Sequence, residues 1–345
     1  MKRIVVCCDG TWRRLDEADS TNVARVALAV LPKDPDGTPQ LVVHLDGVGA
    51  GRGGSRLGRL LDRYMGGAFG AGLDDSIAEA YRLLVFNYEP GDEIYLFGYS
   101  RGAFTARSLG GLIRKCGILS RRNARRIADA LALYRDRDPE KGPTCEPSLM
   151  FRARYAPDVA LGEEEVAWRR RRFPDRDHSR THLLKISYVG VWDTVGALGV
   201  PGFVLASPLI NHRHQFHDPM LSSHVAAARH AVAADERRPS FAPTLWSNLG
   251  ELNEGAGGAD ARYQQRWFPG VHGAVGGGVR DRGLSSLALL WVLEGAERQG
   301  LAVDPEVKAE LAREADPMGP LVPYWQVSSP VSWLRALTAT DREGP

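Results

Sequence analysis

Two short apolar runs, each ended by Asp-Gly, predict the first two strands of the chain. Residues 4–8 and 41–45 are rich in β-branched side chains, and Asp9-Gly10 and Asp46-Gly47 follow them directly. Runs of this length bounded by turn residues are typical of buried parallel strands. Between them, the polar residues 20–22 can cap a helix whose apolar positions continue to residue 30. This part of the sequence predicts a strand, helix, strand unit.

The clearest pattern lies around Ser100. A turn at residues 90–92 precedes an apolar strand at 93–97, and Gly98-Tyr99-Ser100-Arg101-Gly102 then leads into an apolar helix at 103–115. A second helix is predicted at 74–85, where apolar side chains recur on one face. Strand, sharp turn and helix therefore follow one another at this serine.

The second half of the chain alternates in the same way. Residues 183–191 form an apolar strand pattern that ends just before Asp193, residues 224–234 are interpreted as a helix, and 267–278 as a strand that runs into a loop. An apolar helix is predicted at 284–296. Alternating strands and helices are typical of an α/β fold with a mostly parallel sheet and helices on both faces.

The distribution of charged residues separates one further segment from the rest of the chain. Residues 118–180 are charged and poor in strand signal, and an acidic triplet at 163–165 precedes four arginines at 169–172, about one helical turn away. We interpret this stretch as a helical insertion in a single domain of residues 1–320. Residues 321–345 are expected to form a loosely structured tail, in which Trp325, Trp333 and Leu334 could contact lipid but more ordinarily pack on the body.

Composition limits the classes of function. The chain has 345 residues, 44 Lys and Arg, 42 Asp and Glu, and a net charge of +2, which gives no reason to expect nucleic acid as a partner. Its amino terminus lacks the apolar core of a signal peptide, and no run of about 18 apolar residues could span a membrane. We therefore expect a cytoplasmic protein without a transmembrane segment. Leaderless secretion, peripheral membrane contact and the oligomeric state are left open.

The Gly98 to Gly102 segment carries the first candidate for chemistry. Glycines on both sides of Ser100 allow the tight strand-to-helix turn that presents a serine hydroxyl for nucleophilic attack. Serine is a weak nucleophile at neutral pH, so it needs an imidazole to take its proton and a carboxylate to orient that imidazole. The flanking strand and helix favour a nucleophile over a purely structural turn.

Asp193 and His272 are the candidates for the other two roles. Asp193 follows a predicted strand, His272 lies in a loop after an apolar run, and together they give the order Ser, Asp, His. Three other carboxylates compete with Asp193 for the acid role, namely Asp9, Asp46 and Asp235.

Four further residues are expected to support the site. Asp9, Gly10 and Thr11 follow the first strand, and Arg101 follows the serine. The amides of Gly10 or Thr11 and of Arg101 are candidates for stabilising an oxyanion. A turn closed by the Asp9 side chain explains the same residues equally well.

The sequence predicts neither a cofactor nor a metal. His212, His214 and His217 form the one histidine cluster, but their spacing does not place all three on one helical face. The Gly-rich loop at 47–54 contains GxGxxG, yet no second strand with an acidic end follows it, so a nucleotide-binding enzyme is the weaker interpretation.

Two other classes of protein fit the sequence less well than a hydrolase does. Aspartyl-phosphate hydrolases carry their nucleophile two positions before an Asp-Gly-Thr aspartate, and that position is Cys7 here. A non-catalytic lipid- or protein-binding module is suggested only by arginine runs at 121–126 and 169–172, which are usually solvated faces.

Four motifs in one order resemble a known family. The motifs are Cys-Asp-Gly-Thr-Trp at 8–12, Gly-Tyr-Ser-Arg-Gly-Ala-Phe-Thr-Ala-Arg at 98–107, Gly-Val-Trp-Asp-Thr-Val-Gly at 190–196 and Phe-Pro-Gly-Val-His at 268–272. A fifth similar segment is His-Ala-Val-Ala-Ala-Asp-Glu-Arg-Arg at 230–238. Together they resemble an α/β-hydrolase domain that is also the catalytic domain of type VI secretion phospholipase effectors.

The resemblance implies a serine hydrolase that cleaves carboxylic esters of small molecules or lipids, with glycerophospholipids as substrates of the best-known relatives. It covers roughly residues 1–300. The family commonly has Ser-Asp after the histidine, whereas this chain has Gly273-Ala274, which bears on the local loop and on a supporting carboxylate. The additional membrane-docking modules of larger effectors are not expected in this sequence.

Overall fold

The computed structural model describes residues 1–10, 13, 15, 18–47, 67–196, 220–238, 241–254 and 261–321, with the side chains of 67–71 excepted. Several predicted features lie outside the described residues. These are Thr11, most of the Gly-rich loop at 47–54, the histidine cluster at 212–217 and the tail beyond Leu321.

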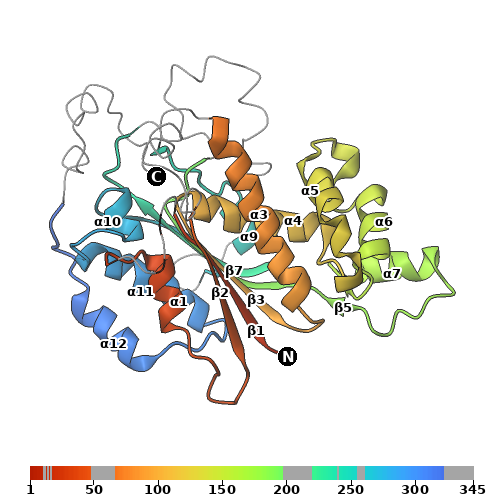
Figure 1. The fold of residues 1–345 in the computed structure, drawn as a ribbon, viewed down its shortest axis with the longest axis horizontal. Coiled ribbons are helices and arrows are strands. Elements are labelled where there is room, and N and C mark those ends of the chain that lie inside the picture. Colours follow the sequence, from red (N-terminus) through yellow and green to blue (C-terminus); the bar gives the residue numbers. More distant parts are fainter. Residues whose placement is uncertain are drawn as a thin grey trace.

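A six-stranded parallel sheet forms the centre of the molecule (Figure 1). Its strand order is β2-β1-β3-β6-β7-β8. Because all neighbours are parallel, the strands end at one common edge, and their loops gather there. The strands are β1 (Arg3–Cys8), β2 (Gln40–Leu45), β3 (Glu93–Tyr99), β6 (Ile186–Trp192), β7 (Val225–Ala233) and β8 (Tyr263–Phe268).

Helices cover both faces of this sheet, as an α/β fold requires. In Figure 1, α1, α11 and α12 lie on one side, and α3, α4 and the helices that follow α4 lie on the other. The helices of the main body are α1 (Asn22–Ala29), α3 (Gly67–Asn87), α4 (Arg101–Cys116), α9 (Leu249–Asn253), α10 (His272–Gly276), α11 (Gly283–Glu297) and α12 (Pro305–Glu314).

Alternation along the strands explains the two layers. On β1, Ile4, Val6 and Cys8 face the core beneath α3 and α4, whereas Val5 and Cys7 face the core beneath α1 and α11. All five side chains are essentially inaccessible to solvent. The buried run at 4–8 therefore belongs to a strand packed on both faces, in agreement with the α/β class predicted from the sequence.

The predicted helix at 224–234 is wrong, because Val225–Ala233 forms strand β7. Its sequence, Val-Ala-Ala-Ala-Arg-His-Ala-Val-Ala, is rich in alanine, the residue with the highest helix propensity. Pairing with β6 on one edge and β8 on the other overrides that propensity. Small side chains also suit a central strand covered by a helix, because they let the layers approach closely.

The segment at 267–278 also differs from the prediction. Strand β8 ends at Phe268, and a short helix, α10, begins at His272 with Val271 as its N-cap. His272 is therefore the first residue of a helix, not a residue in an extended loop. This position fixes its backbone more firmly than a loop would.

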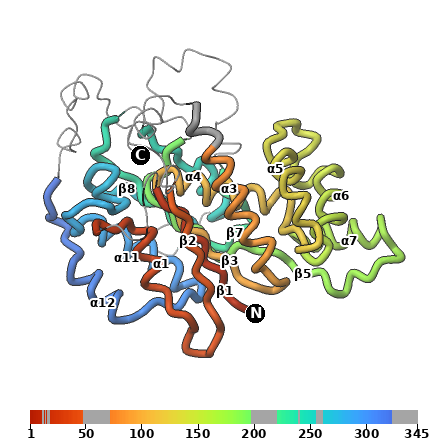
Figure 2. Tube along the Cα trace, in the orientation of Figure 1, coloured from red at the N-terminus to blue at the C-terminus, as the bar shows by residue number. Residues whose placement is uncertain are grey.

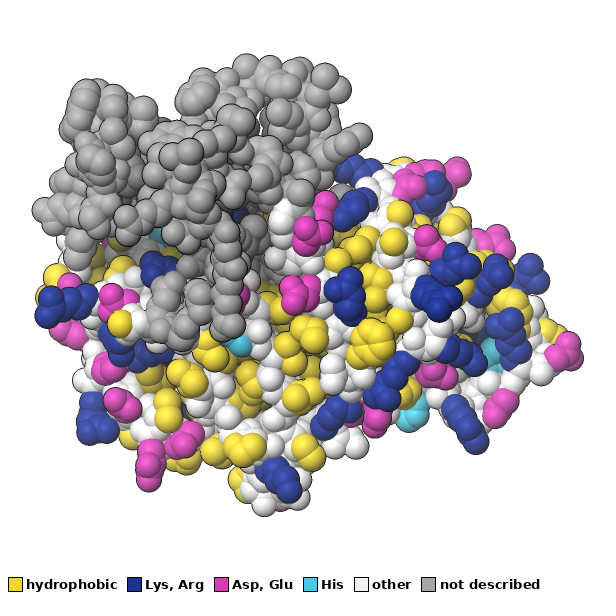
Figure 3. Space-filling view, viewed as in Figure 1, with side chains coloured by type: hydrophobic (Ala, Val, Ile, Leu, Met, Phe, Trp, Pro, Cys, Tyr) yellow, Lys and Arg dark blue, Asp and Glu magenta, His cyan; other side chains and the backbone are white. Residues whose placement is uncertain are grey.

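Residues 118–180 contain mostly helices, as their charge pattern predicts. The elements are η1 (Arg121–Arg126), α5 (Ile127–Arg135), η2 (Pro139–Lys141), α6 (Glu146–Tyr155) and α7 (Glu163–Arg172), with β4 (Val159–Ala160) pairing only with β5 (His182–Leu183). In both ribbon and tube views these helices stand beside α4, away from the edge formed by β2 (Figures 1 and 2). On the face shown in Figure 3, Lys and Arg side chains gather over them with acidic side chains among them.

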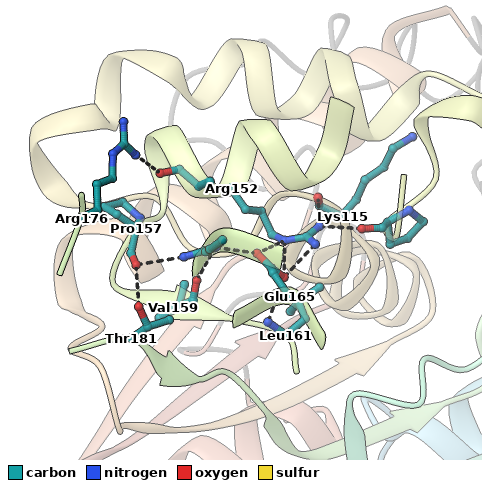
Figure 4. A network of polar contacts seen from close by, with 11 residues as sticks. Lys115, Arg152, Pro157, Val159, Leu161, Glu165, Arg176 and Thr181 are labelled. Carbon is teal, nitrogen blue, oxygen red and sulfur yellow. Dashed lines mark hydrogen bonds and ion pairs between the residues drawn. The ribbon is translucent and has the colours of Figure 1, made fainter. Parts of the chain in front are cut away.

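A buried ion-pair network holds these helices together (Figure 4). The Glu165 carboxylate binds Arg152 at 2.8 Å and also accepts from Arg169 Nε at 3.1 Å. Both arginines are 2% exposed and also donate to backbone carbonyls, those of Lys115 and Val159 among them. Burial acts to raise the pKa of Glu165, but the two arginines lower it overall, so the carboxylate stays ionised.

Substitution of Glu165 tests the importance of this network. Glu165→Gln leaves two buried guanidinium groups without their anion, and we expect the free energy of unfolding to fall by about 3–5 kcal/mol. Glu163→Gln, on the exposed face of the same helix, should change it by no more than about 0.5 kcal/mol. Urea unfolding of both variants measures the difference. Equal midpoints and slopes for the two variants would contradict the prediction.

Candidate active site

Ser100 and Asp193 come from neighbouring strand ends. Ser100 follows β3 and Asp193 follows β6, and these strands pair directly. The backbone N–H of Ser100 donates to the carbonyl of Trp192, the residue before Asp193, at 3.0 Å. Both residues thus lie at the carboxyl edge of the sheet, where parallel α/β folds place their sites.

The turn at Ser100 has a strained backbone. Ser100 has φ 58° and ψ −121°, a conformation that a residue with a side chain rarely adopts. The glycines on either side make it possible. A Cβ on Gly98 would lie 2.4 Å from the carbonyl oxygen of Gly102, and one on Gly102 would lie 2.0 Å from that of Cys8. The first turn of α4 therefore packs directly on the end of β1.

His272 and Asp193 form a short, buried hydrogen bond. Their Nδ1 and Oδ2 atoms are 2.6 Å apart, and the two residues are at most 6% exposed. With Nδ1 bonded to the carboxylate, the Nε2 atom of the ring is left as the atom that can exchange a proton with another group. The structure therefore joins two of the three residues that the sequence singled out.

The Asp193 carboxylate is fixed by its backbone surroundings. Its Oδ1 accepts from the N–H of Ala233 at 2.9 Å, and its own N–H donates to the carbonyl of Ala231 at 2.7 Å. Asp193 has φ 38°, an unusual backbone conformation for a residue other than glycine. Strand β7 thus orients the carboxylate toward His272. Because β7 is a strand, its backbone amides point toward the neighbouring strands, and the amide of Ala233 can donate to the Asp193 carboxylate.

Two aromatic rings enclose the imidazole. The ring of Tyr99 lies 4.7 Å from that of His272 at 31°, and Phe241 approaches it edge-on at the same centroid distance. Burial raises the pKa of Tyr99, so its hydroxyl stays protonated and donates to the His272 carbonyl at 3.2 Å. Burial also lowers the pKa of His272 below 6.5, although Asp193 acts to raise it. The imidazole is therefore neutral at neutral pH.

Asp235 and Glu236 hold the backbone around His272, a role that sequence reasoning missed. Asp235 accepts from the N–H of Gly270 at 2.6 Å, and Glu236 accepts from the N–H of His272 at 3.2 Å. The sequence pattern alone indicates Asp235 only as a rival to Asp193 for orienting the imidazole. Their position directly after the wrongly assigned β7 was the signal that could have placed them at this edge.

Glu236 is itself a buried charge with a partner. Its carboxylate forms two hydrogen bonds with the guanidinium of Arg238, at 2.7 and 2.8 Å, and the Arg238 guanidinium lies 3.6 Å over the Phe241 ring. Burial acts to raise the pKa of Glu236, but Arg238 lowers it overall. Glu236, Arg238 and Phe241 therefore form a chain of contacts that starts and ends on His272.

The remaining rivals for the acid role have other partners. Asp9 accepts from the hydroxyl of Thr21 at 2.9 Å, and its Oδ2 lies 3.2 Å from the ring of His44. The side chain of Asp46 is about half exposed and 3.6 Å from the other ring nitrogen of His44. Asp9 thus ties β1 to the start of α1 and to the end of β2. Its carboxylate thus contacts Gly10, Thr21 and His44, whereas His272 is bound by Asp193.

Two of the residues expected to stabilise an oxyanion lie beside the serine turn: Gly10 packs against Tyr99, and Arg101 directly follows Ser100. The N–H of Gly10 donates to the Asp9 carboxylate at 2.6 Å, which favours the turn interpretation of this motif. The Arg101 amide opens α4, at the positive end of that helix. Burial lowers the pKa of the Arg101 side chain to about 10. Thr11 lies outside the described residues.

Neither a metal cluster nor a spanning helix is found in the part of the chain that the structure describes. Across the described ranges, no three His, Cys, Asp or Glu side chains gather as a metal site would require. Likewise, no helix of the described residues is long and apolar enough to cross a bilayer.

Comparison with known families fits this arrangement. The model of the T6SS phospholipase effector Tle1-like catalytic domain matches residues 2–295, which include all six strands and the three predicted catalytic residues. The chain belongs to this family. Membership favours a hydrolase of the lipase type.

Individual relatives are more distant. An uncharacterized protein of Saccharomyces cerevisiae, YEL023C, is 30% identical over 251 residues, which are 70% of this chain and 32% of that protein. The chain thus spans about a third of that relative's length. An uncharacterized Pseudomonas aeruginosa protein of known structure has 15% identity and a TM-score of 0.45, covering 100% of this chain and 51% of that one. The Tle1 effector bound to the VgrG spike has 14% identity and a TM-score of 0.37, covering 80% and 51%.

Removing the negative charge of Glu236 or the positive charge of Arg238 tests how each affects the pKa of His272. Glu236→Gln removes a negative charge near the imidazole and should lower the pKa of His272 further, whereas Arg238→Met removes a positive charge and should raise it. NMR titration of the imidazole, assigned with His272→Gln, measures both shifts. In the native protein the pKa should lie below 6.5, so His272 contributes stability above pH 6.5 that is lost as the pH falls below it.

The control for this experiment is Arg237→Met, which removes the same charge from the exposed neighbouring position. It should leave the pKa of His272 nearly unchanged. Shifts in the same direction for Glu236→Gln and Arg238→Met would show that these residues act on His272 only through packing.

Proposed function

We propose that this protein is a serine esterase that cleaves carboxylic esters, acyl esters of phospholipids among them, with Ser100, His272 and Asp193 as its catalytic residues. The observation that carries the proposal is the buried 2.6 Å hydrogen bond between His272 and Asp193 at the sheet edge where the strained Ser100 turn lies. Family membership supports the hydrolase class independently.

Acylation follows from the protonation states of the site. The neutral imidazole of His272 takes the proton of the Ser100 hydroxyl through Nε2 as the oxygen attacks the ester carbonyl. Asp193, hydrogen-bonded to Nδ1, orients the ring and stabilises the imidazolium that forms. The tetrahedral intermediate then collapses, the ester C–O bond breaks, and His272 gives its proton to the leaving alcohol. An acyl-serine and a free alcohol result.

Deacylation repeats these steps with water. His272 takes a proton from the water as its oxygen attacks the acyl-serine, and the proton then returns to Ser100 as the carboxylic acid leaves. The negative charge on the carbonyl oxygen in both stages needs donors close to the turn. The amide of Arg101, at the N-terminus of α4, is our first candidate for this role, and Thr11 is the second.

Labelling with a fluorophosphonate probe tests the nucleophile. The native protein should be labelled covalently, and Ser100→Ala should lose the label completely because the attacking oxygen is gone. Ser108→Ala is the matched control. Ser108 is a buried serine on α4, the helix that follows Ser100, and its hydroxyl has no hydrogen-bond partner in the described structure. Intact-mass spectrometry measures the adduct. Equal labelling of native protein and Ser100→Ala would refute the assignment.

A substrate panel tests the ester class. We expect the purified protein to release fatty acid from diacyl phospholipid vesicles and to cleave short acyl esters, with both activities lost in Ser100→Ala. Peptides should not be cleaved. Fatty-acid release and p-nitrophenol release measure the two activities. If only short water-soluble esters are turned over, the serine esterase stands and the phospholipid substrate must be abandoned.

A further inference from the structure

A cavity of about 400 Å³ lies on the face of the sheet covered by α4, separate from the catalytic residues. Its volume is within the range of about 300–1,000 Å³ that is usual for sites of small ligands. Ser100, Asp193 and His272 do not line it. Its walls come from α4, from the turns around η2 and from the residues that lead into β7.

One face of α4 forms the long wall of the cavity. The lining residues of this helix are 106, 107, 110, 111, 114 and 115, which recur at helical spacing and span about 14 Å along the axis. Gly110 and Gly111 stand in the middle of this wall and carry no side chains into it. A Cβ on Gly110 would meet its nearest neighbour at an ordinary 3.6 Å, so packing there does not demand glycine.

The cavity is apolar on one side. Ala106, Val189, Leu221, Val225 and Trp246 line it, and all five are buried. The Trp246 ring is held in place by the Arg107 guanidinium, which lies 5.1 Å from the ring centroid. This side can therefore accept an aliphatic chain without leaving polar groups unsatisfied.

The opposite end of the cavity is cationic. Arg114, Lys115 and Arg137 line it together with the carboxylates of Asp136 and Asp138. The Asp136 carboxylate is bound by Lys141, which is outside the cavity, at 2.6 Å, and Asp138 accepts from the N–H of Glu140 at 3.0 Å. Both acids thus already have partners in the turns that carry them.

Lys115 is the residue that points to a ligand. It is 8% exposed, and its ammonium donates to the backbone carbonyl of Asp136 at 2.7 Å. Within the described part of the chain it forms no ion pair. Burial lowers the pKa of Lys115, although the charges of the nearby Asp136 and Asp138 act to raise it. Arg152, which belongs to the network around Glu165, donates to the backbone carbonyl of Lys115 at 2.9 Å and fixes this end of α4 (Figure 4).

We propose that this cavity binds a single-chain anionic amphiphile, with its head group at Lys115 and its aliphatic chain along the apolar wall toward Trp246. An anionic head would neutralise the buried ammonium, and the chain would fill the apolar side. A simple inorganic anion would leave that side empty, and a neutral chain would leave the Lys115 ammonium with its carbonyl hydrogen bond but without an ion pair. The site is independent of the proposed esterase activity, because binding needs none of the catalytic residues.

Isothermal titration calorimetry with four probes tests the proposal. Decanoate and decyl phosphate carry an anion on the same chain, decan-1-ol carries the chain without charge, and acetate carries the charge without the chain. Decanoate should bind with one-to-one stoichiometry, and decanol and acetate at least about tenfold more weakly, the loss expected when a charged hydrogen bond or the apolar contact is missing. Decyl phosphate, compared with decanoate, distinguishes a phosphate from a carboxylate head.

Variants assign the binding to Lys115. Lys115→Met should weaken decanoate binding at least about tenfold, Lys115→Arg should retain most of it, and Ser100→Ala should bind as the native protein does. The matched control is Lys308→Met, which removes a surface lysine paired with Glu297 at 2.7 Å. If Lys115→Met fails to fold, Lys115→Gln replaces it.

Two results would overturn the proposal. Equal affinity for decanoate and decanol, or for decanoate and acetate, would mean that the cavity does not recognise an anionic amphiphile. Unchanged decanoate affinity in Lys115→Met would place any binding elsewhere on the protein. Neither result depends on whether Ser100 reacts with a fluorophosphonate. The proposed binding site and the proposed esterase activity are therefore tested independently.

Discussion

The contact between the first turn of α4 and the end of β1 is the constraint on which the rest of the site depends. With no side chain at Gly102, the helix backbone comes so close to β1 that a Cβ would lie 2.0 Å from the Cys8 oxygen. This approach leaves Ser100 with a positive φ between strand and helix. The cost of that conformation, roughly 1–3 kcal/mol, is offset by the packing of β3 and α4 in the core. A strained serine is thereby held by two of the best-packed elements of the molecule.

Much of this arrangement could be predicted from local patterns. The buried runs at 4–8 and 41–45 and the turn around Ser100 carry their signals within a few residues, so strands β1, β2 and β3 and helix α4 were expected near their actual bounds. The acid was harder to choose, because Asp9, Asp46, Asp193 and Asp235 all follow apolar segments. Only the three-dimensional structure shows that Asp193 is the one whose carboxylate contacts His272.

The errors have a common physical cause. Residues 225–233 were interpreted as a helix because alanine favours helices locally, whereas the two neighbouring strands that pair with them are distant in sequence. Once this strand was missed, Asp235 and Glu236 could not be placed at the sheet edge beside His272. The buried charge of Lys115 was equally invisible, since its lack of an anionic partner depends on how the turns around η2 fold back on α4.

The ring of Tyr99 lies between the Ser100 turn, the His272 imidazole and helix α10. It comes from the residue directly before Ser100, stacks on His272, and lies where a side chain on Gly276 would have to be, because a Cβ there would be 1.9 Å from it. The Ser100 turn, the imidazole and helix α10 are therefore coupled by direct packing through the Tyr99 ring. The position of the His272 ring therefore depends on the tyrosine that precedes Ser100, and a residue larger than glycine at position 276 would displace the Tyr99 ring. The same serine turn placed in another α/β protein, without this tyrosine and glycine, would lack that coupling.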